Sequence, residues 1–288
     1  MPTLSSTQLE SFSRDGFAVL PGLFSPHWVN RVKERFGPLF AGEFETGVWP
    51  DEWYWREEIS LPDATRHMSG AWKSDKTIAA VSLSAELGKV VSTLVDWPGA
   101  RIGLDTLWWK TPGAKAIALH QDSTYHASLN PAEVVTCWVA LDDTEKNAGT
   151  IEYVPGSHRW ALKEDIGEFH APKGDYQSTM RAAARAAGVI DPEVVQMEVA
   201  AGTCIIHHGR LWHGSGSNQS ATRIRRSLAV HLTRSDTQFR SDRLGYVYGR
   251  YKRRGDLTMD ESFFPITWTR DGYRTPWLSE YCEDACAP

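Results

Sequence analysis

The chain has 288 residues, of which 41% are hydrophobic and 23% are charged. These values are typical of a soluble globular protein that is large enough to bury a sizeable core. The formal net charge is −5, and the longest basic run is Lys252-Arg253-Arg254. This charge balance argues against nucleic-acid binding, because that affinity comes mainly from neutralising phosphates.

The sequence also gives no sign of a membrane protein. It has no apolar run that approaches the roughly 20 residues needed to span a bilayer. The first six residues, Met1 to Ser6, lack the basic segment and following apolar stretch of a secretory signal. We therefore expect a cytoplasmic protein.

Helical patterns dominate the first hundred residues. Ser6 or Thr7 is the expected cap of a first helix, and a short strand is expected near Phe17–Leu20. Ser25-Pro26 starts a second helix, whose apolar residues recur every three or four positions. Residues 41–75 are rich in Trp, Glu, Asp and Pro without a clear period, and we expect an ordered loop region there. Helical spacing returns from Ser84 to Val95.

After residue 100 the pattern changes to short runs rich in Val, Ile, Thr and aromatic residues. The expected strands are Arg101–Trp109, Val134–Leu141, Thr150–Val154, Val194–Val199, Thr203–His207 and Ser227–Thr233, with a helix at Gln177–Ala187. Helices followed by strands are typical of an antiparallel sandwich or barrel with helices packed outside.

We expect one domain in three parts. Residues 1–99 form a mostly helical part, residues 100–233 the β core, and residues 234–288 a C-terminal extension. The extension is too long and too aromatic for disorder, so we expect it to pack on the barrel as a lid or to form a homodimer contact.

A candidate metal site begins at His120-Gln121-Asp122. On an extended strand, residues two apart point to the same face, so this segment can place an imidazole beside a carboxylate. A third ligand must come from elsewhere, and His207, His208 and His213 compete for that position. Two imidazoles and one carboxylate hold one face of iron(II) and leave the other face open for chemistry.

Six short motifs follow one another in an order and spacing that resemble those of a known family. They are Lys110–Gly113, His120–Asp122, Trp138–Asp143, Asn147–Ile151, Val154–His158 and His213–Asn218. The chain resembles the phytanoyl-CoA dioxygenase family of iron(II)- and 2-oxoglutarate-dependent oxygenases from about residue 17 to about residue 233. The resemblance implies a mainly β fold with flanking helices, a double-stranded β-helix (a cupin-like jelly roll).

The same resemblance implies that His120, Asp122 and His213 bind the iron. It selects His213 over the competing histidines because the family's distal histidine precedes a Gly-Ser-Gly-x-Asn segment, which here ends at Asn218. Related halogenases have Gly or Ala in place of the carboxylate. The presence of Asp122 therefore implies hydroxylation or another oxidation rather than halogenation.

A dicarboxylate such as 2-oxoglutarate needs a cation at its far end, and the planar fork of arginine suits a carboxylate. Arg223, Arg225 and Arg226 follow the distal histidine. Related oxygenases use an Arg-x-Ser pair, which favours Arg225 with Ser227. The other two arginines stay open as alternatives, because the family's arginine usually stands about eleven residues after the histidine and Arg225 stands twelve after His213.

The resemblance also places Trp138 beside the co-substrate, and Thr106 is a weaker candidate for the wall of that pocket. The residues expected to contact substrate are Tyr125, His126, Trp109, Arg210 and Trp212. The segments Glu45–Trp55 and Arg240–Pro288 are aromatic and charged enough to form a lid. Since the chain shows no obvious acyl-CoA site, we expect a small polar or aromatic metabolite as substrate.

The sequence therefore predicts an enzyme with iron(II) as cofactor and 2-oxoglutarate and O2 as co-substrates. It would oxidise a C–H bond of a small-molecule metabolite and release succinate and CO2. Hydroxylation is the favoured outcome, although desaturation and demethylation begin in the same way. One alternative is a non-catalytic metal-binding jelly-roll protein, and another is a zinc hydrolase that uses the same three ligands.

Overall fold

The computed structural model describes residues 4–164, 167–245 and 248–285 of the chain. The α-helices in these ranges are α1 (Ser6–Asp15), α2 (Pro26–Ala41), α3 (Lys76–Ser82), α4 (Ala85–Leu94), α5 (Asp122–Tyr125), α6 (Ser178–Ala186) and α7 (Leu278–Tyr281). Short 3-10 turns are η1 (Ala71–Lys73), η2 (Lys146–Ala148), η3 (Ser157–Arg159) and η4 (Tyr248–Tyr251).

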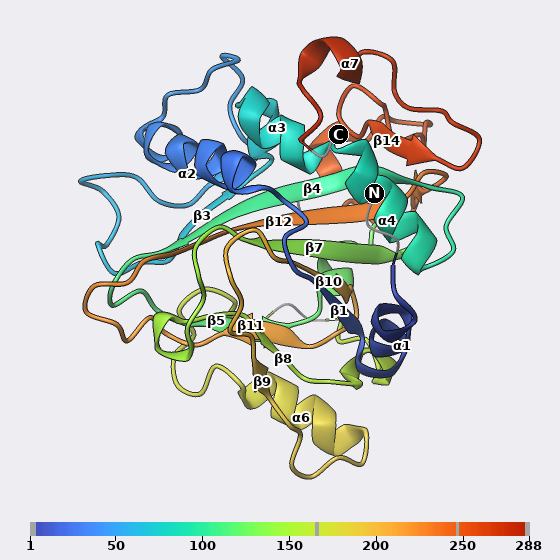
Figure 1. Cartoon of the computed structure of the whole chain (residues 1–288). Coiled ribbons are helices and arrows are strands. Elements are labelled where there is room, and N and C mark those ends of the chain that lie inside the picture. Colours follow the sequence, from blue (N-terminus) through green and yellow to red (C-terminus); the bar gives the residue numbers. More distant parts are fainter. Residues whose placement is uncertain (1–3, 165–166, 246–247, 286–288) are drawn as a thin grey trace.

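The strands divide into a larger and a smaller antiparallel sheet and one short pair. The strands of the larger sheet are β1 (Phe17–Leu20), β10 (Cys204–His208), β7 (Val134–Ala140), β12 (Arg225–Arg234), β4 (Gly99–Lys110), β3 (Arg66–Ser69) and β2 (Glu52–Trp53), with β14 (Ile266–Thr269) also on β4. The smaller sheet is β5 (Ile117–His120), β11 (His213–Ser215), β8 (Glu152–Tyr153) and β9 (Val195–Gln196), and β13 (Gln238–Phe239) pairs with β6 (Leu129–Asn130). Figure 1 shows the larger sheet above the smaller one. The predicted jelly-roll fold is confirmed.

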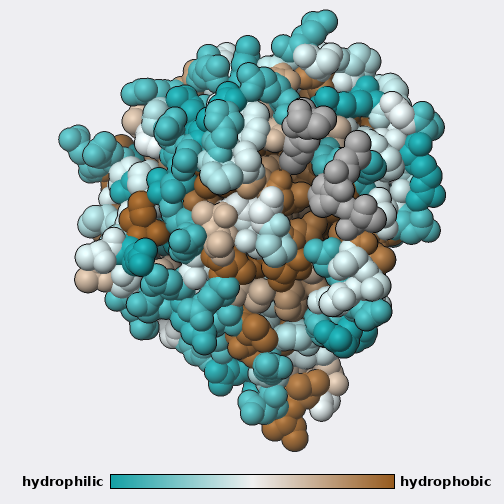
Figure 2. Space-filling view, in the orientation of Figure 1, coloured by the Kyte–Doolittle hydropathy of each residue, from teal (hydrophilic) through white to brown (hydrophobic). Residues whose placement is uncertain are grey.

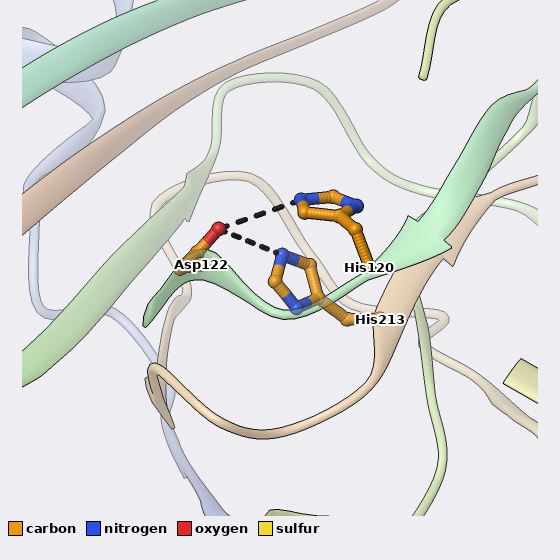
Figure 3. Close-up of side chains that lie close together, drawn as sticks. All are labelled: His120, Asp122 and His213. Carbon is orange, nitrogen blue, oxygen red and sulfur yellow. Dashed lines mark ion pairs between the residues drawn. The ribbon is translucent and has the colours of Figure 1, made fainter. Parts of the chain in front are cut away.

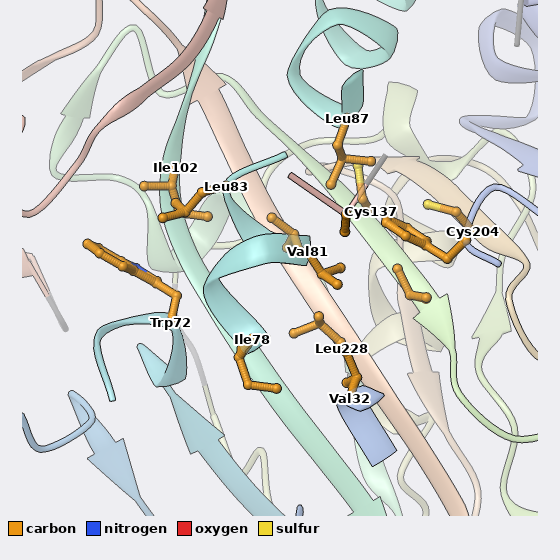
Figure 4. Packing of buried hydrophobic residues seen from close by; sticks show 14 of the residues in the cluster. Val32, Trp72, Ile78, Val81, Leu83, Leu87, Ile102, Cys137, Cys204 and Leu228 are labelled. Carbon is orange, nitrogen blue, oxygen red and sulfur yellow. The ribbon is translucent and has the colours of Figure 1, made fainter. Parts of the chain in front are cut away.

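Helices α2, α3 and α4 cover the outer face of the larger sheet. Figure 4 shows Ile78 of α3 and Leu87 of α4 packed near Ile102 of β4, Cys137 of β7 and Leu228 of β12. Side chains alternate along a strand, so the residues between these face the other way. The larger sheet is therefore buried on both faces, one against helices and one toward the interior between the sheets.

The N-terminal part supplies three strands to the larger sheet, of which β1 is the short strand predicted near Phe17–Leu20. Strand β1 pairs with β10, while β3 joins β4 and carries β2 at its edge. The expectation of a loop region at 41–75 is therefore wrong for β2, β3 and η1. These strands have two and four residues, which is too short to show a period.

The first helix is present, but its cap differs from the predicted one. Ser5 caps α1, and its Oγ accepts a hydrogen bond from the Gln8 backbone N–H at 3.2 Å. The Gln8 side chain reaches back to the Ser5 N–H at 2.9 Å. This reciprocal pair is a capping box in which glutamine takes the place of glutamate.

One stretch of the described residues, Lys76–Leu94, is long and apolar enough to cross a membrane by length and composition alone. In the fold, 67% of this span is buried. Leu83 and Ser84 divide it into α3 and α4. Its apolar residues belong to the core beneath the helices, which accounts for its hydropathy.

The C-terminal extension packs against the larger sheet. Strand β14 pairs with β4, and Leu278 of α7 lies in the main hydrophobic core.

Figure 2 shows that the face of the molecule seen in Figure 1 is mostly hydrophilic around its edge, with hydrophobic residues gathered near the middle.

Candidate metal centre

His120, Asp122 and His213 point toward one another between the two sheets (Figure 3). Their possible ligand atoms all lie within 4.8 Å of one another. The Nε2 atom of each histidine is 3.4 Å from Asp122 Oδ1. Metal–nitrogen bonds of about 2.1 Å place two ligands at right angles about 3 Å apart. The three side chains can therefore bind one ion from one side and leave its other side open.

Strand pairing explains why the two histidines meet. In the smaller sheet, His213 of β11 lies directly opposite His120 of β5. Gln121 keeps an extended backbone (φ −120°, ψ 124°), and α5 begins at the next residue. Asp122 therefore still points to the same side as His120, as the spacing predicted, although it has already left the strand.

Hydrogen bonds orient both imidazoles for metal binding. Nδ1 of His120 lies 2.9 Å from the Ala118 carbonyl oxygen, and Nδ1 of His213 lies 2.9 Å from the Leu211 carbonyl oxygen. A carbonyl can only accept, so each Nδ1 carries the hydrogen. Each Nε2 then has a free lone pair directed at the position that a metal would occupy.

The second oxygen of Asp122 is held by residues other than the two ligand histidines. Thr136 donates its hydroxyl to Asp122 Oδ2 at 2.5 Å, and His207 Nε2 lies 3.2 Å from the same atom. The Tyr153 hydroxyl lies 2.8 Å from His207 Nδ1. His207 and Thr136 thus hold Oδ2, while Oδ1 lies 3.4 Å from Nε2 of both ligand histidines.

Burial alone would raise the pKa of the Asp122 carboxyl, but the surrounding histidines, His213 foremost, hold that pKa well below its usual range. The carboxylate therefore stays ionised. Of the competing histidines, His208 lies outside the cavity among the described residues, and its Nδ1 accepts from the Arg210 backbone N–H at 3.0 Å.

The three side chains line a cavity of about 400 Å³ between the sheets. This volume lies in the range of small-molecule sites. Arg225, Trp138 and Thr106 line the same cavity and are almost fully buried. They come from three neighbouring strands of the larger sheet, β12, β7 and β4.

Arg225 is held in place without a carboxylate partner. Its Nε and Nη2 donate to the Gly149 carbonyl oxygen at 3.2 and 2.9 Å, and its Nη1 donates to Ser227 Oγ at 2.9 Å. Burial lowers the pKa of Arg225 to about 10, so the group is still a cation at neutral pH. No Asp or Glu of the described chain lies within ion-pair distance of it, which suits a site for an anionic ligand.

The other two arginines do not reach the cavity. Arg226 makes a two-bond ion pair with Asp142 on the opposite face of β12, with Nε and Nη2 at 2.9 and 2.7 Å from the carboxylate oxygens. Arg223 lies 3.0 Å from Glu145 at the surface. Strand alternation therefore leaves Arg225 as the arginine that lines the cavity among the described residues.

Comparisons with known proteins agree with this geometry. The sequence model of the phytanoyl-CoA dioxygenase (PhyH) family matches residues 12–227. The chain belongs to the phytanoyl-CoA dioxygenase family. It is therefore an iron- and 2-oxoglutarate-dependent dioxygenase, as predicted, and the two-histidine, one-aspartate donor set fits iron(II).

Individual members of this group are distant relatives of the chain. A probable alpha-ketoglutarate-dependent hypophosphite dioxygenase of Stutzerimonas stutzeri is 24% identical over 238 residues, covering 80% of this chain and 78% of that protein. The epimerase SnoN, solved with Fe3+, alpha ketoglutarate and nogalamycin RO, has a TM-score of 0.69 at 19% identity and covers 91% of this chain and 97% of its own. EctD from S. alaskensis, solved with 2-oxoglutarate and 5-hydroxyectoine, has a TM-score of 0.64 at 20% identity, covering 82% and 78%.

The structure separates the predicted substrate contacts of this dioxygenase into two groups. Tyr125 and His126 line the cavity. Trp109, Arg210 and Trp212 do not line it in the described part of the chain, and the expectation for these three is corrected.

Each of the three has a different structural place. Trp109 follows Trp108 on β4 and faces outward, where its ring packs edge-on against Phe36 at 5.9 Å. Arg210 donates to the Trp160 carbonyl oxygen at 2.6 Å. Trp212 is fully buried in a separate hydrophobic cluster behind the smaller sheet.

Several cavity residues were not predicted to be part of the site. Ser215 lines the cavity and was not predicted. Ser227, which was predicted to bind 2-oxoglutarate with Arg225, does not line the cavity and instead accepts a hydrogen bond from Arg225. Thr136 shares the inward face of β7 with Trp138, and that alternation was the available signal. His67 lies in the segment without a clear period, so nothing in the sequence pointed to it.

Proposed function

We propose that this dioxygenase hydroxylates a C–H bond of a small-molecule metabolite. In this proposal His120, Asp122 and His213 bind iron(II), and Arg225 binds the distal carboxylate of 2-oxoglutarate. The observation that carries the proposal is that the three ligand side chains and a buried arginine without a carboxylate partner line one cavity. A cytoplasmic location and a homodimer remain predictions from the sequence.

The proposed reaction follows from the groups that the cavity residues would bind. Iron and 2-oxoglutarate supply the oxidising chemistry when bound, in which O2 and 2-oxoglutarate are converted with a substrate C–H group to C–OH, succinate and CO2. The chain's own side chains hold the metal on one face, fix the dicarboxylate by its far end and surround both with buried walls. Asp122 occupies a ligand position that would otherwise be open, which supports hydroxylation over halogenation.

The test is a titration of 2-oxoglutarate into the iron(II)-loaded protein without oxygen. We expect a metal-to-ligand absorption band in the wild type, followed by succinate release once oxygen is admitted. We expect Asp122→Ala to lose the succinate release. Asp63→Ala is the matched control, because Asp63 is an exposed aspartate paired with Lys115 at 3.4 Å. Succinate release by Asp122→Ala would refute the ligand assignment, and a wild type without a band would favour a non-catalytic metal-binding protein.

A second variant tests the arginine. We expect Arg225→Gln to raise the KM for 2-oxoglutarate by about 10- to 100-fold, since a hydrogen bond to a charged group is worth about 1.5–3 kcal/mol. Arg226→Gln is the control, because Arg226 lies on the outer face of the same strand. A larger rise with Arg226→Gln than with Arg225→Gln would assign the wrong arginine.

A further inference from the structure

A stack of three rings forms the cavity wall beside the candidate metal site. His67 of β3 lies between Tyr54 and Trp108, with ring centroids 5.1 and 4.3 Å away and interplanar angles of 12° and 20°. His170 lies 5.1 Å from His67 on the same wall. All four residues line the cavity, so aromatic rings make up this part of its wall.

The stacked imidazole has hydrogen-bonding capacity left over. His67 is 6% exposed, and its Nε2 lies 3.0 Å from Ser69 Oγ. Its Nδ1 has no hydrogen-bond partner among the described residues. This atom is shielded from water in the unliganded fold, so a ligand group reaches it when the surrounding rings shift. A hydrogen bond formed there recovers the cost of leaving a buried polar atom unpaired.

The charges on the cavity wall are few. Among the described lining residues, Arg225 is the one Lys or Arg, and Asp122 and Glu52 are the carboxylates. Burial holds the pKa of His67 well below its usual value and lowers that of His170 to about 4, so both are neutral at pH 7. Once 2-oxoglutarate pairs with Arg225, the described lining residues offer no second Lys or Arg for another anion.

We propose that the substrate is an uncharged, ring-containing molecule that lies against the Tyr54–His67–Trp108 stack and hydrogen-bonds His67. The proposal rests on the proposed function, since it assigns Arg225 to 2-oxoglutarate. It excludes substrates that carry a carboxylate, a phosphate or coenzyme A near the metal. A buried anion without a paired cation would pay a desolvation cost that this wall does not repay.

The first test compares three probes that share one ring system. 2-Naphthol is uncharged at pH 7, whereas 2-naphthoate and 2-naphthyl phosphate are anions. Binding to the iron(II)- and 2-oxoglutarate-loaded protein is measured by equilibrium dialysis without oxygen. We expect 2-naphthol to bind at least tenfold more tightly than either anion. Equal or tighter binding of an anion, or no binding of 2-naphthol, overturns the proposal.

The second test concerns His67. His67→Phe keeps a ring in the stack but removes both nitrogens. In the wild type we expect 2-naphthol to bind more tightly than 2-methylnaphthalene, which lacks the hydroxyl, and we expect this preference to fall about fivefold or more in His67→Phe. His208→Phe, a histidine outside the cavity, is the control and should keep the preference. An unchanged preference in His67→Phe overturns the role of His67 as a hydrogen-bonding residue.

The proposed function and the proposed substrate class can be contradicted separately. The absorption band of bound 2-oxoglutarate is recorded before any probe is added. A missing band contradicts the proposed function, whereas an intact band with tight binding of an anionic probe contradicts the substrate class alone. Should His67→Phe fail to fold, the comparison of the three naphthyl probes on the wild type still decides the charge of the substrate.

Discussion

At the residue scale, the least expected feature of the metal centre is the set of hydrogen bonds that holds Asp122 Oδ2. A carboxylate that serves as a metal ligand through one oxygen can rotate about its side-chain bonds unless its other oxygen is held. Here Thr136 and His207 hold that oxygen, and Tyr153 in turn lies within hydrogen-bond distance of His207. All four residues are buried. The outer residues therefore fix the ligand before any metal arrives.

This arrangement predicts the effect of removing one hydroxyl. Thr136→Val keeps the shape of the side chain but deletes the 2.5 Å hydrogen bond to Asp122. Loss of such an outer partner typically weakens metal binding by about 10- to 100-fold. We expect a loss of this size in the iron(II) affinity, measured by direct titration without oxygen.

Thr233→Val is the matched control for that measurement. Thr233 is also a fully buried threonine, and its hydroxyl donates to the Glu133 carbonyl oxygen at 2.9 Å, away from the cavity. We expect this variant to lose some stability and to keep its iron affinity. If both variants lose affinity equally, the effect belongs to general destabilisation and not to Asp122.

At the scale of elements, strand alternation is the part of the site that the sequence could predict. Alternation on the predicted strand Ser227–Thr233 and the residues before it put Arg225 and His231 on one face, and both line the cavity. The same rule separates Trp108 from Trp109 on β4, but it cannot say which face is inward. That choice depends on helices packed from the N-terminal part, which no local pattern reports.

The short strands β2 and β3 could not be predicted from the sequence. Strand β2 has two residues and β3 has four. They form because β4 offers an edge to β3, and β3 in turn offers one to β2. Their place in the sheet brings Tyr54 and His67 to the cavity wall. A period needs more residues than these strands have, so the aromatic wall could not be predicted from the sequence.

Gly149 provides the carbonyl oxygen that accepts hydrogen bonds from Arg225. Gly149 ends η2 with φ +67°, and a Cβ added there would lie 2.7 Å from the Gly216 carbonyl oxygen. We expect Gly149→Ala to lower the free energy of unfolding by about 2–5 kcal/mol, from backbone strain together with this overlap. It should also weaken 2-oxoglutarate binding, because the carbonyl that holds Arg225 moves. Chemical denaturation and the absorption titration measure the two effects.

Gly22 separates strain from overlap in that experiment. It has a similar φ of +65°, and a Cβ added there would meet nothing within 4 Å. Gly22→Ala should therefore cost only the strain, about 1–2 kcal/mol, and leave 2-oxoglutarate binding unchanged. Equal losses of stability in the two variants would mean that the contact with Gly216 is relieved without cost.

At the scale of the whole molecule, a buried acid lies between the larger sheet and its helices. Asp105 of β4 accepts hydrogen bonds from the Trp72 backbone N–H at 2.9 Å and from Ser82 Oγ at 3.0 Å. Burial raises its pKa to about 7, although Ser82 and Trp72 act in the opposite direction. The folded protein thus retains a proton on this group over a pH range in which the unfolded chain has lost it.

This difference in proton binding gives a pH-dependent stability. Because the folded state binds the extra proton, Asp105 makes the free energy of unfolding fall as pH rises from about 4 to about 7. Asp105→Asn removes the titration and keeps an oxygen acceptor. In metal-free protein, we expect the stability of Asp105→Asn relative to the wild type to increase by about 3 kcal/mol between pH 5 and pH 8.

Chemical denaturation at the two pH values measures this change. Asp63→Asn, at an exposed aspartate, should show no comparable pH dependence. If the difference in free energy of unfolding between Asp105→Asn and the wild type is the same at pH 5 and pH 8, then Asp105 is ionised at both pH values. Its hydrogen-bond partners would then fully offset the effect of burial on its pKa.

The two faces of the larger sheet differ in how freely their residues can be exchanged during evolution. On β12, Leu228 and Val230 face the helices, while Ala229 and His231 face the cavity. Exchanging residues of the second set alters the shape offered to a ligand and leaves the packed layer intact. The substrate can then change during evolution while the fold stays stable. Proteins that share this fold at only 19–20% identity are the expected result of such exchanges.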